Sequence, residues 1–139
     1  MQIQDIKIRI MTSKDLPSIR TMMENEKFFW HKVWTNDTLR KAIEMAQDSA
    51  LVYEENSNIV GFVFGYNLGF RGYISALLVK NGYRKNGIGK LLLNRIENNL
   101  EKNKCELIIA DIIPDAELFF KKLGWKKPYA KLYCKRILE

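Results

Sequence analysis

The spacing of apolar and polar residues predicts strands and helices that alternate along the first half of the chain. Residues 3–10, IQDIKIRI, alternate Ile with polar residues, which is the period of a strand with one buried face. Residues 12–29 and 35–47 carry apolar side chains at helical spacing, behind Ser, Thr or Asn residues that can cap a helix. Three segments rich in Val, Ile, Tyr and Phe follow and predict strands joined by hairpins: 49–55, 58–68 and 71–80.

The second half of the chain continues the alternation. Residues 87–103 have the most regular helical pattern, with Ile or Leu at every fourth position from Ile88 to Leu100. The apolar run at 105–113 predicts a buried strand, and Pro114 then opens a short helix that Gly124 ends. The last elements expected are the helix 114–123, a short strand near Trp125 and a strand over 129–138.

The order of these elements, β-α-α-β-β-β-α-β-α-β, predicts an α/β protein with a mixed sheet (α+β). The sheet has both antiparallel and parallel neighbours and helices on its flanks, with a right-handed crossover between residues 73 and 113. The sequence shows no repeat, no low-complexity tract and no linker rich in Pro, Gly or Ser. A single domain over residues 1–139 is therefore expected.

Composition and sequence patterns exclude several classes of protein and of ligand, including membrane-spanning proteins and zinc sites built from several histidines. The chain is 47% hydrophobic and 28% charged, which is typical of a globular domain, and no apolar run approaches the length of a membrane span. Its first ten residues lack the apolar core of an export signal, so we expect a cytoplasmic protein without a membrane partner. With two cysteines and one histidine, neither a disulfide framework nor a zinc site with several imidazoles is expected. We expect a monomer or a homodimer.

The net charge of +7 fits an anionic cofactor, a nucleic acid or simple solubility. The basic residues follow no known nucleic-acid motif, although Lys residues are interleaved with Trp and Tyr over 121–136. We therefore do not expect a nucleic-acid partner. A more specific signal is the segment GYRKNGIGK at 82–90, which places three glycines and three basic residues at the start of the strongest predicted helix.

A helix start of this kind favours phosphate or pyrophosphate, because its N–H groups are unpaired and carry partial positive charge. The alternative is a glycine turn with solvated basic side chains. A nucleotide triphosphatase loop does not fit, since Ile88 stands where the essential lysine is needed. A dinucleotide-binding loop does not fit either, since Leu92 replaces the third glycine.

The loop and its neighbours resemble the GNAT superfamily of N-acetyltransferases. The family signature, Gln/Arg-x-x-Gly-x-Gly/Ala, is matched by RKNGIG at residues 84–89, five residues after the strand end LLV at 77–79. Segments similar to other parts of the family extend over nearly the whole chain, and AELFFKKLGW at 116–125 is similar to its late helix. The resemblance implies a GNAT-like acyl-CoA N-acyltransferase fold that moves an acetyl group from acetyl-CoA to a primary amine by direct attack in a ternary complex. The amine could belong to a small molecule or to a protein.

The resemblance also implies which residues hold the cofactor. Backbone groups of one strand would pair with the pantetheine arm of coenzyme A, and backbone N–H groups of the loop would hold its pyrophosphate. The N–H of Leu78 or of Val79 would stabilise the oxyanion. The cofactor-binding residues implied are Leu77, Leu78, Val79, Arg84, Lys85, Asn86, Gly87, Ile88, Gly89 and Lys90.

The acid–base residues of the family are missing at their usual positions. Phe120 stands at the position of the family's tyrosine, Ile113 at that of its asparagine, and Ser75 or Ala76 at that of its glutamate. Phe120 is expected to be a core residue. This gap keeps a second hypothesis open, in which the chain is a non-catalytic module that binds acyl-CoA.

The catalytic candidates that remain are Asp111, His31 and Tyr133. Asp111 ends a predicted strand near the expected reaction centre, and its alternative role is to cap the helix 114–123. His31 is an imidazole in a region that lines the acceptor site in the family, and its alternative is a surface loop residue. The aromatic run FFWHKVW around His31, residues 28–34, predicts either a wall of the acceptor site or a helix–helix core.

Overall fold

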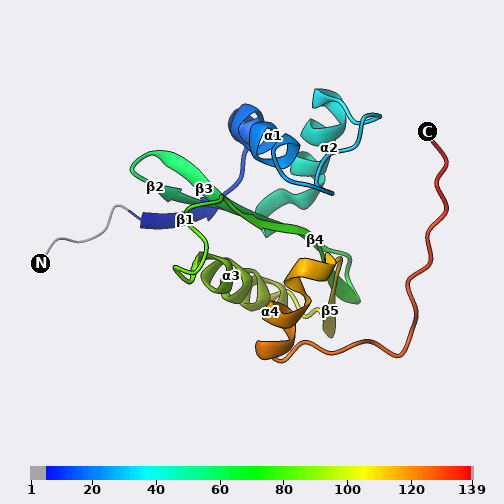
Figure 1. The fold of residues 1–139 in the computed structure, drawn as a ribbon. Coiled ribbons are helices and arrows are strands. Elements are labelled where there is room, and N and C mark those ends of the chain that lie inside the picture. The colour runs from blue at the N-terminus through cyan, green and yellow to red at the C-terminus, as the bar shows by residue number, and fades with distance from the viewer. Residues whose placement is uncertain (1–5, 139) are drawn as a thin grey trace, which may run out of the picture.

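The structure is a computed structural model that describes residues 6–138 (Figure 1). Five strands form one sheet in the order β1-β2-β3-β4-β5. Neighbours from β1 to β4 are antiparallel, and β4 and β5 are parallel, which confirms the expected mixed sheet. The strands are β1 (Ile6–Ile10), β2 (Ala50–Glu55), β3 (Asn58–Asn67), β4 (Arg71–Val79) and β5 (Leu107–Ala110).

Helices cover both faces of this sheet (Figure 1). They are α1 (Leu16–Glu24), α2 (Asn36–Ala46), α3 (Ile88–Lys102) and α4 (Glu117–Lys122), with single 3-10 turns at Ser13–Asp15, Gln47–Ser49 and Pro114–Ala116. One apolar cluster joins α1 and α2 to the sheet, and a second joins α3 and α4 to its other face. No helix among the residues described is both long and apolar enough to cross a membrane.

The contact of α3 with the sheet follows from the four-residue spacing in its sequence. Leu92, Ile96 and Leu100 are fully buried. Two strand glycines let this helix lie close: a Cβ at Gly65 would lie 2.8 Å from a side-chain carbon of Ile96, and one at Gly72 would lie 2.6 Å from Leu100. Any larger residue in either strand would push α3 outward, which would cost packing along its whole buried face.

An ion-pair cluster fixes the start of α1 to the sheet. The guanidinium of Arg9 on β1 donates to both carboxylate oxygens of Asp15, over 2.8 and 2.9 Å, and also contacts Glu54 on β2. Asp15 additionally accepts from the N–H of Thr12 over 2.8 Å. The helix expected over 12–29 is shorter in the structure. Its first residues form the 3-10 turn Ser13–Asp15, and α1 ends at Glu24.

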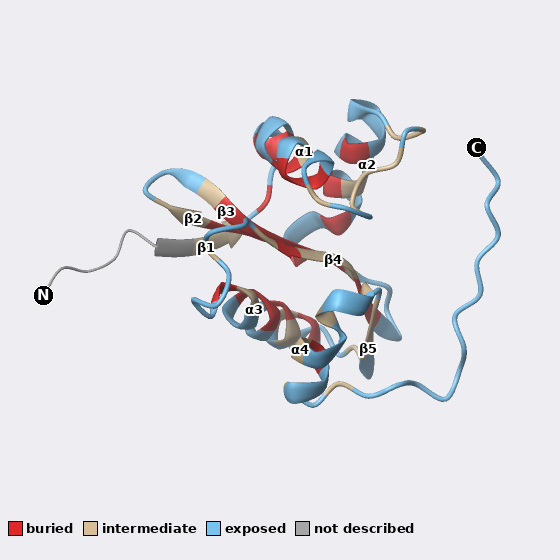
Figure 2. Cartoon of the chain, in the orientation of Figure 1, coloured by how far each residue is buried: buried red, intermediate tan, exposed pale blue. Residues whose placement is uncertain are grey.

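The structure corrects the expected C-terminal part of the sheet. β5 covers four residues instead of 105–113 and is only partly buried, because β4 is its one neighbour among the residues described. The strand expected over 129–138 is absent: the segment is extended and exposed, without a backbone partner (Figure 2). No strand forms near Trp125 either, since that side chain packs on Phe120. A strand requires a neighbour, and within residues 6–138 no strand pairs with this segment.

Candidate active site

The sheet opens between β4 and β5. The two strands pair only from Arg71–Ile74 with Leu107–Ala110, and the last bond between them runs from the N–H of Asp111 to the carbonyl of Ile74, over 3.0 Å. At that point the pairing of β4 with β3 shifts register, so Ser75 forms a bulge. Beyond the bulge, β4 continues to Val79 beside β3, and no other strand of the described part of the chain pairs with its second edge, which is the open edge.

The direction of the backbone groups on this open edge follows from the antiparallel ladder. The N–H of Lys80 donates to the carbonyl of Val60 on β3 over 2.8 Å. Because successive residues of a strand alternate in direction, Leu78 also directs its backbone groups to β3, whereas Leu77 and Val79 direct theirs to the open edge. In agreement, the carbonyl of Val79 accepts a 2.7 Å hydrogen bond from the Arg84 side chain, outside the ladder.

The loop 82–90 leads from this edge into α3. Gly87 is the N-cap of α3 with φ of 79°, and no side chain caps the first turn, so the N–H groups of that turn are available to a ligand. Lys85 also has a positive φ, of 74°. Arg84 is engaged within the protein, since it bonds Val79 and forms an ion pair with Glu26. The exposed Lys85 and Lys90 side chains add positive charge around the turn.

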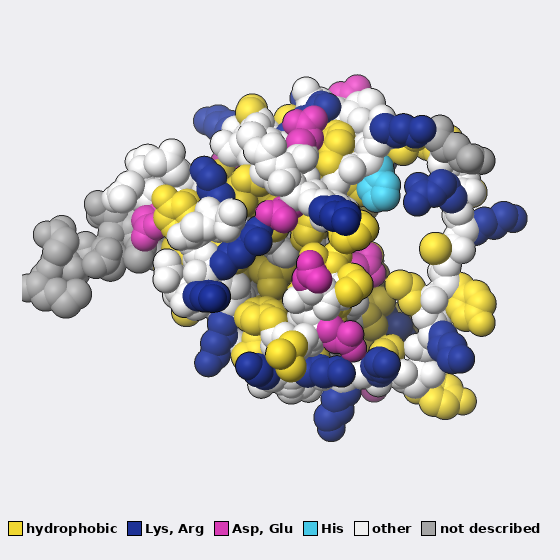
Figure 3. Space-filling view, viewed as in Figure 1, with side chains coloured by type: hydrophobic (Ala, Val, Ile, Leu, Met, Phe, Trp, Pro, Cys, Tyr) yellow, Lys and Arg dark blue, Asp and Glu magenta, His cyan; other side chains and the backbone are white. Residues whose placement is uncertain are grey.

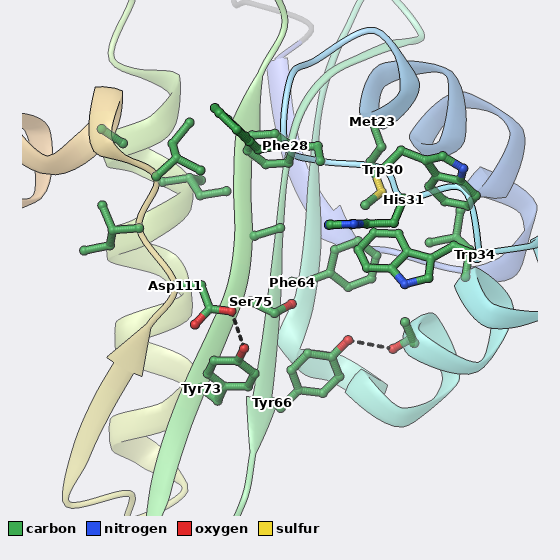
Figure 4. A pocket seen from close by; sticks show the side chains of 18 of the residues that line it. Met23, Phe28, Trp30, His31, Trp34, Phe64, Tyr66, Tyr73, Ser75 and Asp111 are labelled. Atoms are coloured by element: carbon green, nitrogen blue, oxygen red, sulfur yellow. Dashed lines mark hydrogen bonds between the residues drawn. The ribbon is translucent and has the colours of Figure 1, made fainter. Parts of the chain in front are cut away.

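A cavity of about 500 Å³ begins at this edge and extends to the connection between α1 and α2 (Figure 4). Most of its lining comes from three parts of the chain, and Met23 of α1 with Thr38, Leu39 and Ala42 of α2 completes it. The sheet contributes Phe64, Tyr66, Tyr73, Ser75, Ala76 and Leu77. The connection contributes Phe28, Phe29, Trp30, His31 and Trp34, and the segment after β5 contributes Asp111, Ile112, Ile113, Ala116 and Phe120.

Asp111 meets Tyr73 in this cavity. The Tyr73 hydroxyl donates to Oδ2 of Asp111 over 2.5 Å (Figure 4). Burial raises the pKa of Tyr73 well above its ordinary value, and the hydrogen bond and negative charge of Asp111 raise it further, so the phenol keeps its proton. The turn Pro114–Ala116 and helix α4 have no side-chain cap, so Asp111 does not take the capping role considered for it.

Tyr73 and its neighbour Tyr66 are site residues that no sequence motif indicated. The two are cross-strand partners whose rings stack at 6.2 Å, and the Tyr66 hydroxyl donates to the carbonyl of Ala42 over 3.2 Å. Burial raises the pKa of Tyr66, with an opposing effect from Ser75. Only the parallel register, which pairs Tyr73 with Ile109, brings Asp111, two residues later, beside Tyr73, and no pattern in the sequence shows that register.

The aromatic run 28–34 packs against the core and also lines the cavity. His31 lies on Trp34 with ring centres 4.6 Å apart, and Trp34 meets Trp30 edge to face at 5.5 Å. Trp30 and Trp34 pack against the core on one side and line the cavity on the other. Arg20 of α1 covers the outer face of Trp30 at 4.6 Å. His31 and Asp111 therefore stand on different walls of the same cavity (Figure 4).

The remaining candidates lie apart from this arrangement. Tyr133 is 86% exposed in the C-terminal segment and does not line the cavity of its own chain. Phe120 is 3% exposed and packs edge to face between Phe119 and Trp125, as expected of a core residue, while part of it borders the cavity. Gly89 faces Phe119, where a Cβ would make an ordinary contact of 3.4 Å.

Comparison with solved structures identifies the fold. An aminoglycoside N-acetyltransferase, AAC(6')-Iy in complex with CoA, has a TM-score of 0.73 and 15% identity, covering 99% of this chain and 98% of its own. A PaiA N-acetyltransferase from Thermoplasma acidophilum in complex with coenzyme A has 0.74 and 20%, covering 91% and 93%. A ribosomal-protein-alanine N-acetyltransferase from Brucella melitensis biovar Abortus 2308 has 0.76 and 18%, covering 96% and 99%.

The family itself is shown by sequence. A family model described as the acetyltransferase (GNAT) domain matches residues 18–137, which include the open edge of β4, the glycine loop and the cavity. The chain therefore belongs to the GNAT acetyltransferase family, which confirms the N-acetyltransferase assignment and the acetyl-CoA cofactor expected from the loop and the strand before it.

Proposed function

We propose that the protein acetylates a primary amine with an apolar or aromatic body, by direct attack on acetyl-CoA in a ternary complex. The observation that carries this proposal is the position of Asp111, held by Tyr73 in the cavity that joins the open edge of β4 to the aromatic wall. A donor on that edge and an acceptor against that wall would meet beside a carboxylate. Two of the solved neighbours are named for chemically different acceptors, an aminoglycoside and a ribosomal-protein alanine, so the acceptor is argued from this chain's own lining.

The donor side uses backbone groups. Coenzyme A supplies an acetyl thioester when bound. The backbone groups of Leu77 and the N–H of Val79 offer strand-like hydrogen bonds to its pantetheine arm because they face the open edge, while the carbonyl of Val79 is bonded by Arg84. The loop from Arg84 to Lys90 offers the uncapped first turn of α3 to its pyrophosphate. Leu77 also lines the cavity, so its N–H is the oxyanion donor we propose, in preference to Leu78, which faces β3.

The acceptor side favours a single positive charge on an apolar body. Asp111 is the only carboxylate among the residues that line the cavity, and the lining holds no Lys or Arg. An ammonium group is attracted both to this carboxylate and to the faces of the surrounding rings. A polyamine or an aminoglycoside would bring further positive charges, and the lining offers no second carboxylate to pair with them.

Proton transfer is assigned to Asp111. Tyr73 occupies Oδ2, which leaves Oδ1 to accept a proton from the bound ammonium and release the nucleophilic amine. Tyr73 keeps its own proton, so its role is to orient the carboxylate. Phe120 carries no proton for the departing thiolate, and none is required, since a thiolate is a stable leaving group near neutral pH. His31 lies against Trp34 and contributes to the acceptor wall.

Calorimetric titration with acetyl-CoA, with ATP and NAD as controls, is the experiment that tests the donor side. Saturable binding of acetyl-CoA alone is expected, and no binding would remove the enzyme proposal. Release of free thiol is then measured against arylalkylamines, polyamines, aminoglycosides and peptide amino groups. Turnover should be highest with arylalkylamines. Binding without turnover on any amine would instead support the non-catalytic acyl-CoA-binding module.

A further inference from the structure

Arg84 joins the cofactor loop 82–90 to the connection between α1 and α2, residues 25–35. Its Nε donates to the carbonyl of Val79 over 2.7 Å, and its Nη2 forms an ion pair with Glu26, just after the end of α1. Within residues 6–138, no other hydrogen bond or ion pair runs between the loop and this connection. The pair of Glu26 with Arg84 is therefore the direct polar link between the donor side of the site and the segment that carries the aromatic wall.

The connection holds a strained residue next to this link. Phe28 has a φ of 74°, a left-handed conformation that a bulky side chain rarely adopts and that persists only where the surrounding structure holds it. The core does not hold it, since Phe28 is 62% exposed. The turn around Phe28 is closed by the N–H of Phe29, which donates to the carbonyl of Glu26 over 3.3 Å. Glu26 therefore fixes this turn by its backbone, and fixes the turn to the loop by its side chain.

The rest of the aromatic wall is held without the loop. Arg20 of α1 lies over Trp30 at 4.6 Å and donates to the side chain of Asn36, at the start of α2, over 2.7 Å. These contacts stay within the two helices and their connection, so they carry nothing to the donor side. The wall thus has an internal anchor at Trp30 and a second anchor, at Glu26, that reaches the cofactor loop. Phe28 lines the same cavity as Leu77 of the open edge, so a movement of its turn alters the cavity beside the donor.

We propose that Glu26 is a positioning residue that couples, through Arg84, occupation of the acetyl-CoA loop to the conformation of the connection 25–35. When the cofactor is bound, the loop holds Arg84 more firmly, and Arg84 restricts Glu26 and the turn at Phe28. An amine then meets a connection that is already ordered, so the two substrates bind with positive cooperativity. The side chains of Arg84 and Glu26 are 45% and 30% exposed, and Figure 3 shows acidic and basic side chains adjacent at the surface between α1 and the loop before α3. A pair this exposed limits the coupling to about fivefold.

Limited proteolysis tests this coupling without any amine. Trypsin cleaves after Lys27 and Lys32, which are both exposed and both lie in the connection. Coenzyme A is the probe, because it carries no acetyl group that could block a lysine. At saturation it should slow cleavage at these two bonds about three- to fivefold in the wild type and leave the rate unchanged in Glu26→Gln. Glu24→Gln is the matched control: Glu24 is also an ion-paired carboxylate at the end of α1, but its partner is Arg20 of the same helix, so the protection should remain.

The outcomes separate this proposal from the proposed function. Calorimetry of the same samples establishes that coenzyme A binds, and absence of binding in the wild type would remove both. If coenzyme A binds, equal protection in the wild type and in Glu26→Gln would overturn the coupling alone, as would a wild type that gains no protection. Arg84→Gln should abolish the protection as Glu26→Gln does, and the double variant should be cleaved no faster than the faster single variant, because both changes break one link. Additive increases in cleavage rate would show independent contacts and would also overturn the coupling.

Discussion

Tyr73 and Asp111 join two strands at the point where those strands separate. The Tyr73 hydroxyl donates to the Asp111 carboxylate over 2.5 Å, while the N–H of Asp111 makes the last backbone bond to β4. The same residue therefore ends the pairing of β4 with β5 and presents a carboxylate to the cavity. This arrangement holds Asp111 by its backbone and its side chain at once, which is the positioning that a general base requires.

Asp111→Asn is expected to lower kcat/KM for the amine by about 100-fold or more, because the amide cannot accept the ammonium proton. The affinity for acetyl-CoA should be unchanged by calorimetry, since the donor contacts that we propose are backbone groups of β4 and the loop. Asp115→Asn is the matched control, because Asp115 is an exposed carboxylate of the same segment that does not line the cavity. Equal losses in the two variants would contradict the role of Asp111.

Gly87→Val is expected to weaken acetyl-CoA binding by about tenfold or more, because a branched side chain at the N-cap of α3 blocks approach to its N–H groups and each charge-assisted bond contributes about 1.5–3 kcal/mol. Gly69→Val is the matched control. Both glycines have positive φ, 79° and 85°, and both would place a Cβ in open space, so the backbone strain is alike. Titration of both variants separates strain from ligand contact, and equal affinities would contradict the loop assignment.

Phe120→Tyr is expected to fold and to raise kcat, since Phe120 borders the cavity and a phenol there could protonate the departing thiolate. Phe120→Ala, in contrast, should lower the free energy of unfolding by about 3–5 kcal/mol, because the ring fills a site between Phe119 and Trp125. Urea unfolding and steady-state rates measure the two effects. A Tyr variant as unstable as the Ala variant would show that no space exists for the hydroxyl.

Asp15→Asn is expected to lower the free energy of unfolding by about 3 kcal/mol at pH 7, because it leaves Arg9 without its best-placed partner. Burial would raise the pKa of Asp15, but hydrogen bonds from Arg9 and Thr12 outweigh burial and hold the pKa below its ordinary value. A lowered pKa stabilises the fold above the unfolded-state pKa, about 4. That stabilisation is lost as pH falls through the lower, folded-state pKa.

Urea unfolding of the wild type and of Asp15→Asn, measured from pH 7 downward, checks this pH dependence. The difference in the free energy of unfolding between the two proteins should be constant near neutrality and should shrink below about pH 4. Asp37→Asn is the control, since Asp37 pairs with Arg40 but its side chain is 93% exposed, and should cost about 0.5 kcal/mol or less. A difference that grows on acidification would contradict the assigned direction of the pKa shift.

The sequence predicted well those parts of the fold that depend on local pattern. The four-residue spacing from Ile88 to Leu100 predicted α3 within one residue at each end, and the glycine loop before it predicted the start of that helix. Alternation and turn residues likewise located β2, β3 and β4. In each case the pattern of apolar residues lies within the helix or strand that it predicts, so local periodicity was sufficient to locate the element.

Features that depend on distant partners could not be predicted in this way. The segment 129–138 alternates like a strand, but whether it becomes one depends on an edge elsewhere, and β5 is half-buried for the same reason. Tyr73 was not predicted as a site residue because only the register of β4 against β5 brings it to Asp111. Leu78 and Leu77 look equivalent in sequence, and the bond from Lys80 to Val60 decides which of them faces the open edge.

Because of the open edge of β4, the stability of the folded enzyme should depend on the concentration of acetyl-CoA. Residues 75–79 lack a neighbour on that side, and a ligand that bonds Leu77 and Val79 acts as a missing strand. A ligand that binds only the folded state stabilises it by about 2.7 kcal/mol at a concentration 100 times its Kd. The melting temperature should therefore rise with acetyl-CoA concentration, and resistance to proteolysis with it. In a cell depleted of acetyl-CoA, the enzyme would be inactive, and its folded state would also be less stable.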